Sequence, residues 1–437
     1  MVDLVVRSRR AVTPDGERPA AVAVRDGRIV AVEAYDAAVD AADDIDLAEV
    51  ALLPGLVDTH VHVNEPGRTE WEGFATATRA AAAGGVTAIV DMPLNSLPPT
   101  VNAEALRIKR AAAAGQCHVD VGFWGGAVPG NAGELEALHA AGVFGFKAFL
   151  IDSGVPEFPP VDIIELAAAM RAVDALFVVH AEDPSLVEAP ASGGYRDFVA
   201  SRPPAAETSA VALAAAAAYQ TGRRAHILHL SAAAALAPLA EARRAGARVS
   251  AETCPHYLSL AAEEVADDAT EFKCCPPIRS AANRDGLWRA LADGLIECVV
   301  SDHSPCPADL KAGDFASAWG GIASVQLGLR VVWTQARARG HTLSDVAGWM
   351  ARGPADLVGL RHKGRIEVGA DADLVAFDPD ASAVVDASDL HHRHPVTPYA
   401  GRTLRGSVVR TWLRGEVVDG STSRGRLLAR DHGGVPT

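Results

Sequence analysis

The chain has 437 residues, of which 49% are hydrophobic and 22% charged, and its formal net charge is −15 at pH 7. This length suits one large barrel or two to three domains, and the composition is that of an ordinary soluble globular protein. The negative charge disfavours nucleic acid or an anionic membrane as a partner, because both attract basic surfaces.

Membrane segments, signal peptides and disulfides are not expected. The sequence has no run of about 18 apolar residues, which a transmembrane helix needs. The first residues, MVDLVVRSRR, contain an early acid and lack an apolar core with a cleavage site. The six cysteines form no CxxC pair and no regular spacing, which favours a reduced, cytoplasmic protein.

The sequence predicts short β-strands at both ends of the chain. Residues 1–53 contain the runs DLVVRS, AAVAVRDGRIVAVE with an Asp-Gly turn, and ALLPG. Residues 364–437 contain GRIEVGADADLVAFDP and VVRTWLRGEVV. Neither end is large enough alone for a stable sheet, so we expect the two to join in one small β-sandwich domain.

The middle of the chain, residues 54–363, alternates apolar β-rich runs with helical stretches such as 74–83 and 207–220. The predicted strands are 56–62, 86–92, 119–126, 143–149, 176–181, 225–230, 248–253 and 297–302. Eight strands with helices between them predict an α/β fold, a (β/α)8 TIM barrel that serves as the catalytic domain. An open, doubly wound sheet is the alternative, but no GxGxxG motif follows the first strand.

Ionisable side chains stand on five of these predicted strands, and TIM barrels place their chemistry at the C-terminal strand ends. His60 and His62 are two residues apart on one strand, so both imidazoles project from the same face and could hold one metal ion. Alone, such a pair is better explained as two polar residues where a strand surfaces. The full set is harder to dismiss: His60, His62, Lys147, His180, His229 and Asp302.

The number of candidate ligands indicates two metal ions, because one zinc ion takes about four ligands. Lys147 lies in an otherwise apolar run, and a buried lysine loses its charge readily. A neutral amine can add carbon dioxide, and the resulting carbamate has two oxygens that can bridge two cations. A structural ion pair between Lys147 and a barrel carboxylate is the alternative.

Other histidines are weaker candidates. His226 is three residues from His229, so the two face opposite sides of their strand, and His229 is nearer its C-terminal end. His303 is adjacent to Asp302 and should face away from the metals, and a supporting or substrate-side role is the alternative. The HHRH run at 391–394 is expected at the surface or an interface.

The motifs PGLVDTHVH, GFKAF, SDHSP and GRIEVGADADLVAFDP, with isolated His180 and His229, resemble the amidohydrolase superfamily. They are most similar to its cyclic-amidase branch of dihydropyrimidinases, hydantoinases, dihydroorotases and allantoinases. Within that branch HVHVNEPGRTEWEGF, MPLNSLPPT, GFKAFLIDSGVPEFPPV, KCCPPIR and WGGIASVQLGL look most like allantoinases. Ala148 departs from that pattern, because many allantoinases have cysteine or serine there.

The resemblance implies a ligand set and an assembly. Carboxylated Lys147 would bridge two metals, with His60, His62 and Asp302 on one of them and His180 and His229 on the other. The metals would be Zn²⁺, with Mn²⁺, Co²⁺ or Fe²⁺ as alternatives, and the protein a homotetramer.

The implied reaction is hydrolysis of a cyclic amide, most closely allantoin to allantoate in purine breakdown. Two cations would lower the pKa of a bridging water and polarise the ring carbonyl, while Asp302 moves the proton to the leaving nitrogen. No GxSxG nucleophile elbow is present. The alternatives are a dihydropyrimidinase or hydantoinase, a dihydroorotase, a mononuclear deaminase, which would not need Lys147, and a non-catalytic scaffold.

Substrate contacts are expected from loops, because a small ureide ring alternates NH donors and carbonyl acceptors. The candidates are Asn95, Ser153, Cys275, Asn283, Gly321 and Arg68. Dihydroorotases, which bind a substrate carboxylate, have an arginine close after the HxH pair. Arg68 lies six residues after His62, which favours an uncharged ring, and a salt bridge with Glu65 or Glu70 would explain it equally well.

Overall fold

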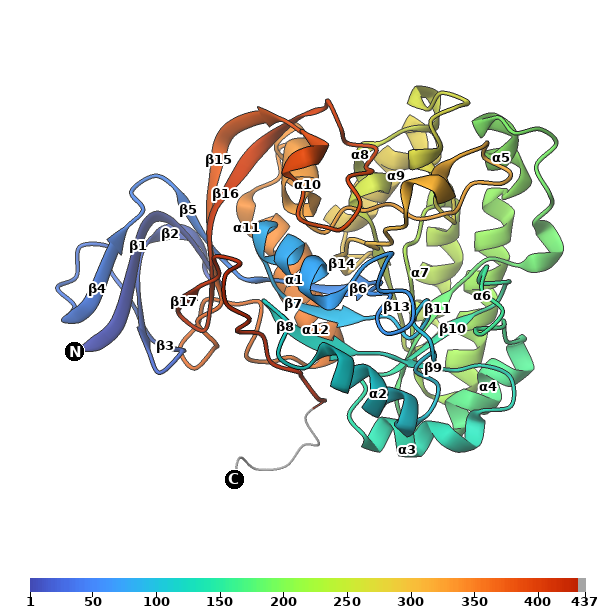
Figure 1. Ribbon diagram of the computed structural model, residues 1–437, viewed down its shortest axis with the longest axis horizontal. Coiled ribbons are helices and arrows are strands. Elements are labelled where there is room, and N and C mark those ends of the chain that lie inside the picture. The colour runs from blue at the N-terminus through green and yellow to red at the C-terminus, as the bar shows by residue number, and fades with distance from the viewer. Residues whose placement is uncertain (431–437) are drawn as a thin grey trace.

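The computed structural model describes residues 1–430, and they form a β-domain beside a barrel that helices surround (Figure 1). The β-domain contains both ends of the chain, with the blue N-terminal strands next to the red C-terminal ones. Its strands are β1 (Val2–Thr13), β2 (Gly16–Arg25), β3 (Arg28–Glu33), β4 (Ala41–Asp46), β5 (Ala51–Pro54), β15 (Leu374–Val384), β16 (Thr403–Leu413) and β17 (Glu416–Val417).

One sheet joins these strands in the order β17-β16-β15-β5-β1-β2-β3, and β4 pairs with β1. The junction between the chain ends is the antiparallel pair β5–β15, in which Leu52 lies opposite Ala376. Leu4, Val6, Leu374 and Trp412 are buried together in the core of this domain. The expectation that both ends build one β-domain is therefore confirmed.

The barrel strands follow the predicted positions closely. They are β6 (Leu56–Val61), β7 (Val86–Asp91), β8 (Asp120–Phe123), β10 (Phe146–Phe149), β11 (Leu176–His180), β12 (Arg224–Ile227), β13 (Val249–Thr253) and β14 (Cys298–Val299). The short β9 (Gly125–Gly126) continues β8 and pairs in parallel with β10. A bridge between Val61 and His303 closes the barrel between its first and last strands.

Helices cover the outside of the barrel (Figure 1). They are α1 (Phe74–Ala83), α2 (Ala103–Ala113), α3 (Leu135–Ala140), α4 (Ile163–Ala172), α5 (Tyr195–Ser201), α6 (Pro204–Thr221), α7 (Leu236–Arg244), α8 (Pro255–Ser259), α9 (Ala281–Ala292), α10 (Gly328–Ala338), α11 (Leu343–Ala347) and α12 (Gly353–Val358). None of the helices in the described part of the chain is long and apolar enough to cross a membrane.

Local sequence explains the helix boundaries. Asn102 caps α2 by accepting from the backbone of Ala105, and Asp162 forms a capping box with Glu165 at α4. The helix α6 starts with Pro204 at its first position and ends at Gly222, which has a left-handed φ of 68°. The predicted helix 74–83 matches α1, and α6 begins three residues before the predicted 207.

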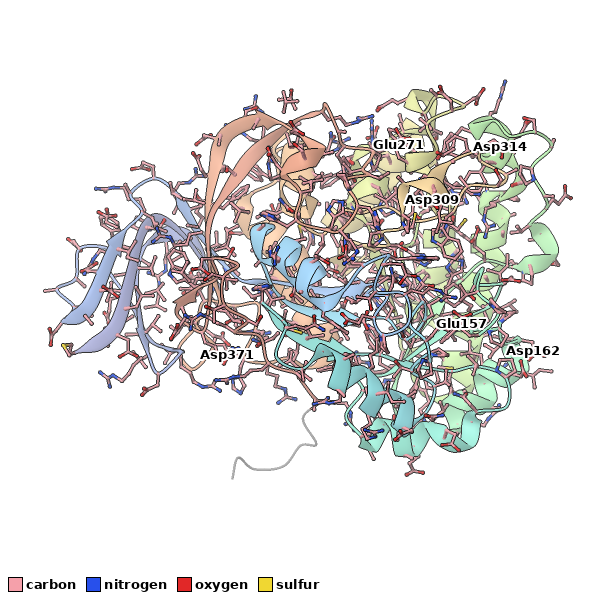
Figure 2. All side chains as sticks on the ribbon, viewed as in Figure 1. Glu157, Asp162, Glu271, Asp309, Asp314 and Asp371 are labelled. Atoms are coloured by element: carbon pink, nitrogen blue, oxygen red, sulfur yellow. The ribbon has the colours of Figure 1, made fainter. Side chains whose placement is uncertain are left out.

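After β17 the chain returns to the barrel. Residues 425–428 run beside β8: Gly425 donates to the carbonyl of Cys117, and Leu428 donates to that of Val121, both at 2.8 Å. Figure 2 places Asp371 where the β-domain meets the barrel and Glu157 in the barrel part of the molecule, away from the β-domain. The two parts are thus joined by several crossings of the chain and by the hydrogen bonds of residues 425–428.

Candidate active site

Three of the predicted ligands converge at the C-terminal end of the barrel. Asp302 Oδ1 lies 3.1 Å from His60 Nε2 and 3.5 Å from His62 Nε2. All three side chains are buried, and their ligand atoms fall within 4.8 Å of one another. Two imidazole nitrogens and a carboxylate oxygen in this arrangement suit a divalent cation such as Zn²⁺.

The other two predicted histidines form an adjacent pair. His180 Nδ1 lies 3.0 Å from His229 Nε2, and the two ring centroids are 4.6 Å apart. The His229 ring is also 5.3 Å from the His60 ring, so this pair lies beside the first group. The geometry therefore offers two neighbouring groups of metal-capable atoms, as the ligand count predicts.

Two buried glutamates hold these histidines from behind, and sequence analysis missed both. Glu252 Oε1 lies 2.6 Å from His60 Nδ1, and Glu182 Oε2 lies 2.8 Å from His180 Nε2. A carboxylate on one ring nitrogen fixes the tautomer and turns the other nitrogen toward the metal. The sequence signal available for Glu182 was its position two residues after His180 in HAED.

Three non-glycine residues at this end of the barrel have a strained, left-handed backbone. Asn95, His229 and Asp302 have left-handed φ values of 67°, 34° and 45°. Such values cost non-glycine residues of order 1–3 kcal/mol and concentrate at functional sites. Two of the three are candidate ligands, and the third lies on the cavity wall, which supports a functional role for this end of the barrel.

Lys147 is buried on β10 and reaches the same cavity. Its ammonium lies 4.6 Å from the centre of the Phe149 ring, and it forms no ion pair or hydrogen bond with any described residue. Burial lowers the pKa of Lys147 to about 8, although Asp302 and Glu252 act in the opposite direction. The alternative of a structural ion pair finds no support, and the amine is easily deprotonated.

The donor set fits a cation by its unused atoms and its charge. His60 Nε2 faces Asp302 Oδ1 at 3.1 Å without hydrogen-bond geometry, and it is buried with no hydrogen-bond partner among the described residues. Burial lowers the pKa of His62 to about 4, so its ring is neutral near pH 7 and can act as a ligand. Burial opposes ionisation of Asp302, but His60 and His62 hold its pKa well below the usual value.

A cavity of about 360 Å³ lies above these side chains. All six predicted ligands line it, together with four of the predicted substrate contacts: Asn95, Ser153, Cys275 and Gly321. Gly321 has a φ of +137°, and a Cβ there would lie 2.5 Å from the carbonyl oxygen of Ser304, so only glycine fits. The volume suits a small ring rather than a polymer.

Two predicted contacts lie outside this cavity. The amide of Asn283, on α9, donates to the carbonyl of Ser231 and accepts from the backbone of Ala233, which fixes a loop next to the barrel. Arg68 pairs with Glu157 at 2.5 Å, and not with Glu65 or Glu70. Both side chains are committed to protein partners, so the structure brings neither to the substrate cavity.

Loops from different strands meet around the mouth of the cavity. The Arg68–Glu157 pair joins the loop after β6 to the loop after β10, and Trp71 packs edge-on against Trp319 at 5.1 Å. Trp319 belongs to the loop after β14. These contacts tie three loops together over the barrel end.

The remaining histidines lie outside the ligand cluster. His226 lies below the mouth and contacts Glu252 and Ser250, while His303 faces away from the ligand cluster and accepts from the backbone of Ser324 at 3.0 Å. The run at 391–394 is expected at the surface or an interface, but His392 is buried within the chain against the His303 ring at 5.6 Å. The segment 391–394 therefore packs on the loops of the barrel.

His256 is a further residue that sequence analysis missed. It is buried, and neither of its ring nitrogens has a hydrogen-bond partner among the described residues. Its nearest metal-capable neighbours are Cys254 and Asp302, within 4.8 Å. The Pro-His-Tyr run after β13 was the available signal, but a lone histidine on a short helix carries little information by itself.

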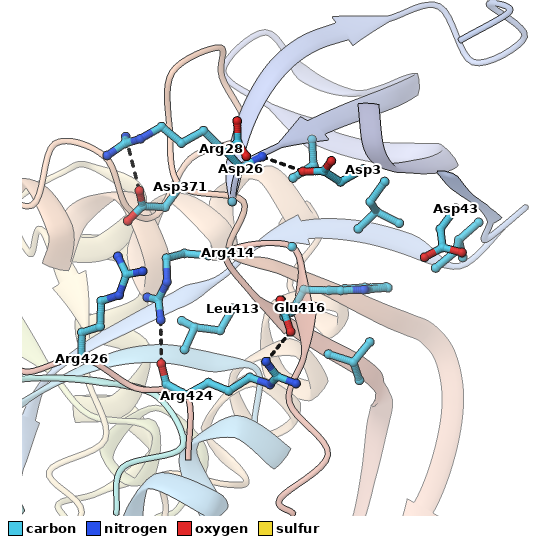
Figure 3. A pocket seen from close by; sticks show the side chains of 17 residues that line it. Asp3, Asp26, Arg28, Asp43, Asp371, Leu413, Arg414, Glu416, Arg424 and Arg426 are labelled. Carbon is cyan, nitrogen blue, oxygen red and sulfur yellow. Dashed lines mark hydrogen bonds and ion pairs between the residues drawn. The ribbon is translucent and has the colours of Figure 1, made fainter. Parts of the chain in front are cut away.

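A second, larger cavity of about 840 Å³ lies away from this site, between the N-terminal strands of the β-domain and the C-terminal residues 412–426 (Figure 3). Its arginines are mostly paired: Arg28 with Asp371 at 3.3 Å, and Arg424 with Glu416. Arg414 also donates to the backbone carbonyl of Arg424 at 2.7 Å. Among the described residues that line it, none forms a metal-capable cluster, so the smaller cavity is the candidate active site.

Comparison with known sequences agrees with this geometry. The model of a family described as "Amidohydrolase family" matches residues 51–418. An allantoinase of Streptomyces avermitilis is 58% identical, over 98% of this chain and 99% of its own length. An allantoinase of Saccharomyces cerevisiae is 48% identical, over 84% of this chain and 82% of its own.

Solved structures share the whole architecture. An L-hydantoinase (dihydropyrimidinase) from Arthrobacter aurescens superimposes with a TM-score of 0.93 and is 31% identical. The match covers 98% of this chain and 100% of the hydantoinase chain. A D-hydantoinase superimposes with a TM-score of 0.89 at 29% identity, over 98% of this chain and 99% of its own. The TIM barrel with an added β-domain is therefore confirmed.

Proposed function

Because this chain belongs to the amidohydrolase family, we propose that it is a metal-dependent cyclic amidohydrolase that opens the ring of allantoin to give allantoate. The observation that carries the proposal is the pair of adjacent ligand groups at the floor of a small cavity. The allantoinases that match over most of this chain support the choice of substrate.

The proposed ligands are those that converge at the barrel mouth. His60, His62 and Asp302 would hold one divalent ion, and His180 and His229 a second one. Lys147 would join them as a carbamate, which its lowered pKa of about 8 favours. We propose Zn²⁺ as the metal, with Mn²⁺, Co²⁺ or Fe²⁺ as alternatives. Bound cations of this kind lower the pKa of water and polarise a carbonyl.

Asp302 is the proposed proton carrier. Its carboxylate lines the cavity, is ionised because of the nearby histidines, and has one oxygen directed at His60 and His62. It would accept a proton from the attacking water and deliver it to the nitrogen of the broken amide bond. The left-handed backbone of Asp302 holds the carboxylate at this position.

The cavity wall would bind the rest of the ring. Asn95, Ser153 and Cys275 contribute polar side chains to the cavity lining, and Gly321 contributes its backbone. Arg68 is neutralised by Glu157, so it offers no free cation for a substrate carboxylate. This favours an uncharged ring over the anionic ring of a dihydroorotase.

A dihydropyrimidinase or hydantoinase is the second candidate, because solved hydantoinases share the fold over the whole chain. The test is a panel of allantoin, hydantoin, dihydrouracil and dihydroorotate with the metal-loaded enzyme. We expect the highest kcat/KM for allantoin. Equal or faster turnover of hydantoin or dihydrouracil would instead assign this chain to the second candidate.

We also propose that the protein is a homotetramer in the cytoplasm. The resemblance to the cyclic-amidase branch supports the tetramer, and the six unpaired cysteines support a reducing compartment. Light scattering coupled to size exclusion should give four times the chain mass of 45.4 kDa.

A further inference from the structure

Arg202 is a cation in the active-site cavity to which the proposed reaction gives no role. It follows α5, and its side chain lines the cavity together with Glu188, Phe198 and Ser201 from the same segment. The side chain is 16% exposed, and the exposed part borders the cavity. A guanidinium in such a place costs desolvation energy, which suggests that it is kept for a contact.

The guanidinium is held by one buried carboxylate. Arg202 Nε donates to Glu182 Oε1 at 3.0 Å, and Nη2 donates to Glu182 Oε2 at 2.7 Å. This two-bond pairing fixes the plane of the guanidinium. Nη1 forms no hydrogen bond with any described residue, so its two N–H groups remain available.

The same carboxylate contacts a candidate metal ligand. Glu182 Oε2 lies 2.8 Å from His180 Nε2, so Arg202, Glu182 and His180 form a continuous row. The scissile amide must lie against His180 and the other ligands. Arg202 and His180 both line the cavity, and the buried Glu182 behind them contacts both, so we place the group that Arg202 meets beyond the ring.

Charge and chemistry define that group. Glu182 neutralises Arg202, so the pair suits the oxygen of an uncharged carbonyl better than an anion. Allantoin has a ureido arm outside its ring, and this arm contains such a carbonyl between two nitrogens, whereas hydantoin lacks the arm. A fixed N–H donor on the wall beyond the ring is what recognition of that arm requires.

We propose that Arg202 is a specificity residue that donates from Nη1 to the carbonyl oxygen of the substrate's ureido arm. This inference rests on the proposed function. It assigns to Arg202 a direct contact with substrate, in addition to its indirect contact with His180 through Glu182.

The test compares Arg202→Met and Arg202→Lys on allantoin and hydantoin, with metal content measured for each protein. Hydantoin serves as a substrate or, if its turnover is too slow, as a competitive inhibitor. For Arg202→Met we expect kcat/KM on allantoin to fall about 10- to 100-fold, the value of one hydrogen bond from a charged donor, mainly through KM. Hydantoin parameters should change less than about threefold, and metal content should stay that of the wild type.

Glu182→Gln is the control for the indirect route. It removes the carboxylate from His180, so it should lower metal content and activity on both substrates. Arg202→Lys keeps the charge but loses the fixed geometry, and it should recover only part of the allantoin loss. An equal fall in kcat/KM for both substrates, or a lower metal content, in Arg202→Met would overturn the proposed direct contact.

The wild-type enzyme separates the two possible failures. If it prefers hydantoin to allantoin, the proposed function fails, and the arm contact fails with it. If it prefers allantoin but Arg202→Met keeps that preference, only the arm contact fails.

Discussion

In the proposed site, Lys147 is the side chain that would distinguish a two-metal site from a one-metal site. It is buried, has no carboxylate partner among the described residues, and has a pKa lowered to about 8. We expect Lys147→Ala to lose bound metal and activity, because no group would then bridge the two ligand sets. Metal analysis and turnover of allantoin measure this directly.

A rescue experiment tests the carbamate itself. Short carboxylic acids such as acetate can occupy the space left by Lys147→Ala, and we expect them to restore part of the metal content and activity. Intact-mass data on the wild-type protein should show one added CO₂. A fully active, two-metal protein with unmodified Lys147 would contradict the hypothesis.

Asp302 should matter more for turnover than for folding. Asp302→Asn keeps the shape of the side chain but removes the basic oxygen, so kcat should fall by about 10²–10⁴, the usual contribution of general acid–base catalysis. The comparison must use variants with matched metal content. Near-normal turnover of metal-loaded Asp302→Asn would mean that another group carries the proton.

The candidate ligands could be predicted residue by residue, but the buried glutamates that hydrogen-bond to them could not. Histidine and aspartate at strand ends stand out because such positions in a barrel face one common space. Glu182 and Glu252 do not stand out, since a buried glutamate is recognised only by the partner that it holds. Asn283 and Arg68 show the reverse problem, because polar residues next to a site also serve to fix loops.

At the scale of elements, the barrel strands were predictable because each is an apolar run between turn residues. The strand β4 (Ala41–Asp46) was missed because its sequence, AADDID, has neither alternation nor β-branched residues except one, and only its pairing with β1 makes it a strand. Residues 364–368, GRIEV, were expected to be a strand but form turns and bends. A left-handed Gly364, with its φ of 71°, interrupts the chain there.

The Arg68–Glu157 pair should couple two loops at the cavity mouth. Both side chains are less than one-fifth exposed, at 19% and 15%, so the pair is screened less than a surface ion pair. We expect a double-mutant cycle of Arg68→Met and Glu157→Gln to give a coupling free energy of unfolding of about 1 kcal/mol. KM should rise and kcat stay nearly constant, because the loops border the site but the pair does not line it. Additive effects of the two changes would contradict the coupling.

At the scale of the whole molecule, one buried lysine joins the barrel to the β-domain. Lys363 Nζ lies 2.8 Å from Asp120 on β8 and 2.7 Å and 3.2 Å from Asp373 and Asp371, which precede β15. Burial alone would lower the pKa of Lys363, but these carboxylates raise it above its usual 10.5. The stabilisation is therefore complete below about pH 10.5 and is lost as pH rises further.

Lys363→Met should be strongly destabilising, because it leaves the buried carboxylate of Asp373 without its cation, while Asp120 and Asp371 keep Arg414 and Arg28. We expect a loss of about 3–5 kcal/mol in the free energy of unfolding, measured by denaturant titration. The matched control is Arg361→Met, two residues away and exposed, which should change stability by less than about 0.5 kcal/mol. A similar, small effect of both changes would show that Lys363 does not hold the two parts together.

The β5–β15 pair also determines when the protein can finish folding during synthesis. The strands β1, β2, β3 and β5 leave the ribosome first, but β5 meets its partner β15 only after the whole barrel has been made. At about 5–20 residues per second, this wait lasts on the order of tens of seconds. During that time an unpaired, apolar strand edge, ALLP, is open to pairing with other chains. Newly made protein should therefore aggregate more readily than the finished fold does. Chaperones that cover strand edges should raise the yield of folded protein.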